Sequence, residues 1–170
     1  MKTTKATKQH DVELILKLYE LRREKRMRRA RAWYFTKFNP TSAADIGRLV
    51  VGGERASAYY RMITSYWDMA ASFVINGGID EKLFLAANTE HVGVFAKLEP
   101  FIAELREAAG EPDYLVHLEQ LVRRIPDVEA VMARRRKIFA RWAKPNKRKP
   151  AAEASNATSV ATNEQAAATG

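Results

Sequence analysis

Apolar residues recur along most of the chain at intervals of three or four positions, which is the spacing of one face of an α-helix. Between Asp11 and Phe38 this pattern predicts one long helix. Its apolar stripe thins over residues 22–31 and returns with Trp33 and the aromatic residues that follow. We expect the helix to stop at Asn39, because the proline that follows disfavours helical geometry in the preceding residue.

Residues that cap or break helices divide the next part of the chain. Ser42, with Asp45 three positions later, resembles a capping box and predicts a short helix over 42–51 that ends at two glycines. The segment 54–75 is apolar around most of its circumference, so we expect it to be the central helix. We also expect Trp67, within this segment, to be buried.

Prolines and glycines mark the boundaries in the second half. Thr89 is expected to cap a helix over 90–109, which Pro100 kinks or divides and Gly110 ends. Pro112 suits the first turn of the following helix. The helices predicted here therefore cover 80–88, 90–109, a segment from Pro112 to before Pro126, and 128–143.

The predicted fold class is all-α, a single helical bundle of about five to seven helices. The segment 144–170 has almost no bulky apolar residues and cannot bury enough surface to offset the entropy lost on ordering. We therefore expect three parts: a flexible N-terminus over 1–10, a helical domain over 11–143 and a disordered basic-to-polar tail over 144–170.

Composition limits the classes of site that the chain can hold. Hydrophobic residues make up 46% of the 170 positions, which is typical of a globular domain. There is no cysteine, which excludes disulfides, thiolate zinc sites, iron–sulfur clusters and cysteine nucleophiles. Charged residues interrupt every candidate secretory signal and membrane-spanning segment, so we expect a cytoplasmic protein of bacterial type.

The net charge of +9 is unevenly distributed. Residues 1–38 carry twelve Lys/Arg and four Asp/Glu, whereas residues 39–131 carry eight and fourteen. Residues 132–150 carry nine basic residues and no acidic one. Two basic segments flanking an acidic middle indicate either an anionic partner or chain ends that pack on the middle with matched charge.

The basic segments supply the candidate binding residues. They favour three roles: contacts to a nucleic-acid backbone, docking in an acidic protein groove, or contact with an anionic membrane surface. The alternative is a solvated face whose cations complement helix dipoles and whose stems cover apolar surface. The candidate polyanion-binding residues are Arg22, Arg23, Arg26, Arg28, Arg29, Arg134, Arg135, Arg136, Lys137 and Arg141.

A second candidate is a buried polar cluster of Arg61, Asp68 and Glu90. Asp68 lies in a strongly apolar helix, two turns after Arg61, and Glu90 begins another helix that could approach it. A buried acid in a pocket would have a perturbed pKa and a functional role. The alternative, which we favour, is a structural ion pair or a hydrogen bond between helices.

Motifs for metal or cofactor chemistry do not fit this sequence. The three histidines, His10, His91 and His117, lack the spacing that helical metal sites repeat. Gly47 and Gly52 have the spacing of a phosphate loop, but Glu54 stands where a hydroxyl residue is required. We therefore expect no catalytic residue, no metal and no cofactor, and we favour a protein that is not an enzyme.

Three stretches resemble a known family. They are LYELRR at 18–23, SYWDMAASFVINGGIDEKLF at 65–84 and FAKLEPFIAELRE at 95–107. They are similar to a family of uncharacterised bacterial helical proteins, catalogued only as a domain of unknown function, over about residues 11–125. The resemblance implies a helical fold and brings no established activity or site residue. Some members carry an N-terminal membrane anchor, and this chain departs from that pattern.

These observations favour a non-enzymatic interaction or scaffold module. Its partner would be an unknown protein or a second copy of the chain. The alternative is a nucleic-acid-associated protein that makes sequence-independent backbone contacts through its basic segments. Peripheral contact with an anionic membrane is a third possibility.

Overall fold

The computed structural model describes residues 5–143, so the tail expected to be disordered lies outside the described residues. The regular elements of the described part are all helices, which confirms the predicted all-α bundle. It contains α1 (Lys5–Arg23), α2 (Lys25–Thr36), α3 (Ala43–Val51), α4 (Arg55–Ile75), α5 (Glu81–Ala87), α6 (Glu90–Leu98), a 3-10 turn (Glu99–Phe101), α7 (Ile102–Ala109), α8 (Val116–Arg123) and α9 (Val128–Ala143).

The helix predicted over 11–38 is wrong in one respect, because the chain bends at Glu24 and forms two helices. Leu18 and Met27 are both buried. They are nine residues apart, so one straight helix with about 100° per residue would place them on opposite faces. The bend brings both residues into one core. α1 already begins at Lys5, ahead of the expected start at Asp11.

Most of the predicted helix ends are present. The Ser42 side chain accepts from the Asp45 amide and completes a capping box at α3. Asp80 accepts a hydrogen bond from the Leu83 amide at the start of α5. Thr89 precedes α6 as expected, but its side chain makes no capping hydrogen bond.

The prediction for Pro112 is wrong. Residues 112–115 form a turn, and α8 begins only at Val116. Leu115 precedes the helix with φ of 55°, in the left-handed region, and its apolar side chain cannot accept a hydrogen bond from the first amides. The start of α8 therefore needs an acceptor from another part of the chain.

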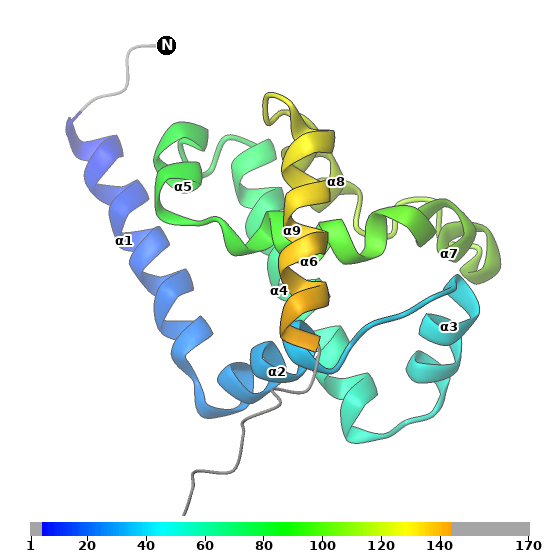
Figure 1. The fold of residues 1–170 in the computed structure, drawn as a ribbon. Helices are drawn as coiled ribbons and strands as arrows, with labels where there is room; N and C mark the ends of the chain where they lie inside the picture. Colours follow the sequence, from blue (N-terminus) through cyan, green and yellow to red (C-terminus); the bar gives the residue numbers. More distant parts are fainter. Residues whose placement is uncertain (1–4, 144–170) are drawn as a thin grey trace, which may run out of the picture.

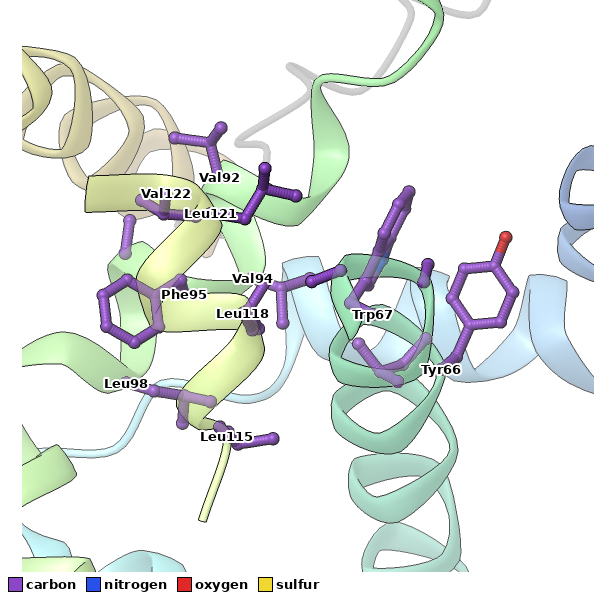
Figure 2. Packing of buried hydrophobic residues seen from close by; sticks show 14 of the residues in the cluster. Tyr66, Trp67, Val92, Val94, Phe95, Leu98, Leu115, Leu118, Leu121 and Val122 are labelled. Carbon is purple, nitrogen blue, oxygen red and sulfur yellow. The ribbon is translucent and has the colours of Figure 1, made fainter. Parts of the chain in front are cut away.

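Helix α4 is central, as the sequence predicted. It packs against α2, α3, α5, α6 and α8 (Figure 1). Trp67 is only 1% exposed, which confirms the expected burial. Apolar side chains of α6 and α8 lie on one side of α4, while Tyr66 points away from them (Figure 2). The Tyr66 hydroxyl donates to the Leu18 carbonyl and so ties α4 to α1.

A close contact fixes α9 on α6. A Cβ atom added to Gly93 of α6 would lie 2.8 Å from Cζ of Phe139 on α9 and 3.5 Å from Cε1 of Phe35 on α2. The missing side chain lets both phenylalanine rings approach the α6 backbone. Their ring centroids lie 5.1 Å apart. Gly93 thus sets the distance between three helices.

We expect Gly93→Ala to destabilise the protein by about 1–3 kcal/mol, because Phe139 must move from its packed position. Gly47→Ala in α3 is the matched control, since its new Cβ would meet nothing within 4 Å. The control should stabilise by about 0.5–1 kcal/mol through helix propensity. Urea unfolding of both variants measures the difference, and equal effects of the two changes would contradict the packing argument.

Candidate polyanion interface

The structure brings the two basic segments together, although they lie about a hundred positions apart in the sequence. Helices α2 and α9 are in contact with each other, and side chains of both reach α6. At the start of α6, Arg31 bonds to Glu90 through Nε at 2.8 and 2.9 Å, and the positive charge of Arg135 contributes to lowering the pKa of His91. Four residues further along their own helices, Phe35 of α2 and Phe139 of α9 stack on each other beside Gly93 of α6.

Seven of the ten candidate cations share two properties. They are exposed or half-buried, and no carboxylate within residues 5–143 forms a salt bridge with them. We call this set the basic surface. It consists of Arg26, Arg28 and Arg29 on α2 and Arg134, Arg135, Lys137 and Arg141 on α9.

The other three candidates are engaged within the fold. The Arg22 guanidinium lies over the rings of Tyr19 and Trp67, with 5.4 and 5.6 Å to the centroids. Arg23 also lies over the Tyr19 ring, at 5.7 Å. Arg136 donates to the Ala96 carbonyl and pairs with Glu99 at 3.4 Å. These contacts support packing, so we do not assign the three residues to the basic surface.

An exposed aromatic residue accompanies the cations of α9. Arg134, Lys137 and Arg141 recur at spacings of three and four, which places them on one face of the helix. Trp142, next in sequence to Arg141, is 57% exposed. Its ring meets Phe139 in a T-shaped contact with centroids 5.6 Å apart, which holds it at the edge of this face.

The three members of the other candidate cluster have different surroundings. Arg61 is exposed. Glu90 binds Arg31 and accepts from Trp67 Nε1 at 3.4 Å. Asp68 faces α8, where its Oδ1 accepts from the Leu118 amide at 2.9 Å. The structure therefore separates Asp68 from Glu90, and the hydrogen bond of Asp68 joins two helices.

Asp68 supplies the acceptor that the start of α8 lacks. Leu118 is the third residue of that helix, and its amide is the donor that an N-cap side chain normally satisfies. Asp68 of α4 takes this role from outside the helix. Its Oδ2 lies 3.5 Å from His117 Nδ1. A carboxylate at this end also complements the helix dipole.

We expect Asp68→Ala to lower the free energy of unfolding by about 1–2 kcal/mol, because the Leu118 amide loses its acceptor. Asp68→Asn keeps an oxygen in the same place and should cost distinctly less. Chemical denaturation of the two variants tests this order. If alanine and asparagine cost the same, the hydrogen bond is not what Asp68 contributes.

Lys97 is a structural cation that the sequence pattern did not indicate. Its Nζ donates to the carbonyls of Tyr34 and Phe38 at 3.0 and 2.6 Å, and to Asn39 Oδ1 at 3.1 Å. All three ammonium donors are thus used at the C-terminal end of α2. Burial lowers the pKa of Lys97 to about 8. A cation among carbonyls at a helix end is stabilised by the dipole as well.

His91 is a second buried polar residue that the sequence did not reveal. It is 1% exposed and lies between the rings of Trp67 and Phe84, at centroid distances of 5.7 and 5.6 Å. Neither ring nitrogen has a hydrogen-bond partner among the described residues. Burial, and then the charge of Arg135, lower the pKa of His91 to about 4. The imidazole is therefore neutral in the folded protein near pH 7.

This burial predicts an acid-dependent loss of stability. In the unfolded chain the His91 pKa is 6.5, so below that value the unfolded state binds a proton that the folded state excludes. Between pH 7.5 and 4.5 the imidazole should cost roughly 2–3 kcal/mol of stability. Over this pH range we expect the free energy of unfolding of the His91→Leu variant to fall by roughly 2–3 kcal/mol less than that of the wild type. If the free energies of unfolding of the two proteins change equally with pH, the burial of a neutral His91 is contradicted.

Metal-ligand clusters and membrane-spanning helices are both absent from residues 5–143. No group of three or more His, Asp or Glu side chains in that range is arranged to hold a metal ion. None of the helices there is both long and apolar enough to cross a bilayer.

Comparison with known proteins gives a family. No curated protein and no solved structure is significantly similar to the chain. A comparison with protein families matches residues 8–125 to the one described as "Domain of unknown function (DUF4760)". The match covers α2 to α8 and most of α1, and it confirms the resemblance seen in the sequence. Since well over half of the chain is matched, the protein belongs to the DUF4760 family.

Proposed function

We propose that this protein is a non-enzymatic interaction module that binds the phosphate backbone of nucleic acid through the basic surface of α2 and α9. The observation that carries the proposal is that α2 and α9, which come from distant segments, pack together and carry seven cations that lack carboxylate partners within residues 5–143. Cations that served only to balance the acidic middle would be paired with it. Arg31 and Arg136 show such pairing, and the basic surface lies beside them.

Nucleic acid fits this surface better than a protein groove does. Arginine predominates, with six guanidinium groups to one ammonium, and its planar donor pairs match phosphate oxygens. The exposed indole of Trp142 offers a stacking face for an unpaired base. No side chain set that reads base edges is evident on the two helices. Binding should therefore be insensitive to sequence and supported mainly by phosphate contacts.

Fluorescence anisotropy with labelled 20-nucleotide probes tests the proposal. At roughly 50 mM salt the wild-type protein should bind a duplex and a single strand, and two duplexes of unrelated sequence should bind with equal affinity. Absence of binding at this salt concentration would overturn the nucleic-acid proposal and leave a scaffold role. A strong preference between the duplexes would contradict backbone recognition.

A further inference from the structure

A cavity of about 1140 Å³ lies between α3, α4, α7 and the segment 111–117. It is distinct from the basic surface, since none of the seven cations lines it. Its volume slightly exceeds the several hundred to 1,000 Å³ that small-molecule sites usually have. Apolar side chains form most of its wall, including Val50 and Val51 of α3, Leu105 of α7 and Met69 of α4.

Small residues create the hollow. The wall from α3 carries Ala43, Ala44 and Gly47, and the wall from α7 carries Ala108 and Ala109. A Cβ atom at Gly47 would meet nothing within 4 Å, so the space in front of this glycine is open. Larger side chains at these positions would close the cavity.

The cavity also has polar groups at defined places. The Tyr60 and Tyr114 hydroxyls are 2.7 Å apart and share one hydrogen bond. Oδ1 of Asp68 accepts a hydrogen bond from the Leu118 amide, whereas Oδ2 lies 3.5 Å from His117 Nδ1. A carboxylate oxygen accepts more than one hydrogen bond, so this atom retains capacity for a ligand donor.

The charge of the lining is opposite to that of the whole protein. Four carboxylates line the cavity against one guanidinium, that of Arg61. Glu104, Glu111 and Asp113 are exposed and form no salt bridge within residues 5–143. The Asp, Glu and Arg side chains of the lining sum to −3, on a chain whose net charge is +9. An apolar floor beneath an acidic rim selects for a cation with an apolar body.

We propose that this cavity binds a small amphiphilic amine, whose hydrocarbon or aromatic body lies along α3 and α7 and whose ammonium group meets the carboxylates of Glu104, Glu111 and Asp113. The apolar body of such an amine complements the apolar floor of the cavity, and its positive charge complements the acidic rim. An anionic amphiphile would be repelled by the rim, and a neutral one would leave the rim unused. This site and the basic surface are independent, so failure of nucleic-acid binding leaves it standing.

Isothermal titration calorimetry with three probes of equal chain length tests the proposal, using n-decylamine, n-decanol and n-decanoate at pH 7 and below micelle formation. The amine is protonated at this pH. We expect decylamine to bind at least about tenfold more tightly than decanol, and decanoate more weakly than both. Equal affinity for the amine and the alcohol, or no binding of the amine at about 1 mM, would overturn the proposal.

Two variants locate the site. Gly47→Leu fills the cavity from α3 and should abolish amine binding, whereas Ala103→Leu, at an exposed position of α7 that does not line it, should not. Glu104→Gln, Glu111→Gln and Asp113→Asn combined should weaken decylamine about tenfold and leave decanol unchanged. Amine binding that survives Gly47→Leu, in a variant that unfolds like wild type, would place the ligand elsewhere.

Discussion

Replacement of Trp67 with alanine is expected to lower the free energy of unfolding by about 3–5 kcal/mol, a larger loss than we expect from any other single substitution in the core. The indole is 1% exposed at the centre of α4. Its ring contacts those of Tyr66 and Phe84, with centroids 5.0 and 6.5 Å apart. Its Nε1 also donates to Glu90, so truncation removes a hydrogen bond as well as packing.

Urea unfolding followed by far-UV circular dichroism measures this loss. Trp142→Ala is the matched control, because that indole is 57% exposed and should cost less than about 0.5 kcal/mol. If Trp67→Ala is folded and nearly as stable as wild type, Trp67 is not the centre of the core. A cost above roughly 3 kcal/mol at Trp142 would contradict the exposed position of that indole.

The four cations of the basic surface on α9 should dominate affinity for nucleic acid. Changing Arg134, Arg135, Lys137 and Arg141 together to glutamine removes up to four phosphate contacts. At about 0.1 M salt, counterion release makes four contacts worth roughly 10³-fold or more in affinity. We therefore expect the variant to bind a 20-bp duplex at least about 10³-fold more weakly while keeping its helicity, since glutamine is a good helix former.

A control variant with the same change in net charge distinguishes an effect of the basic surface from an effect of the total charge of the protein. Four cations outside the basic surface serve for it, all exposed: Arg48, Arg55, Lys82 and Arg124. Their change to glutamine should weaken binding by less than about tenfold, because none lies at the α2–α9 pair. Equal losses in the two variants would mean that affinity follows net charge and that the basic surface is not the site.

Most of the helices were predictable because their ends have local chemical causes. The Ser42 capping box and the division at Pro100 depend on residues a few positions apart. The α8 boundary was not predictable, since its capping acceptor comes from Asp68, about fifty positions away. The bend at Glu24 does leave a trace in the sequence, which is the half-turn offset between the apolar rows of Leu18 and Met27.

The candidate site was predictable as a set of residues but not as a surface. Charge alone could not distinguish Arg136, which pairs with Glu99, from its neighbour Arg135, which has no carboxylate partner in the described chain. Lys97 and His91 were missed because their burial arises from the packing of α2, α4 and α6. The cavity beside Gly47 likewise exists only once α3 and α7 are placed.

The dependence of duplex affinity on salt tests the central claim most directly. Each neutralised phosphate contributes about 0.9 to the slope of log affinity against log salt for a duplex. We predict that the slope of the wild type is steeper by about 3.6 than that of the variant lacking the four α9 cations, measured between roughly 50 and 200 mM salt. Identical slopes for the two proteins, or a wild-type affinity that does not change with salt, would contradict binding by the basic surface.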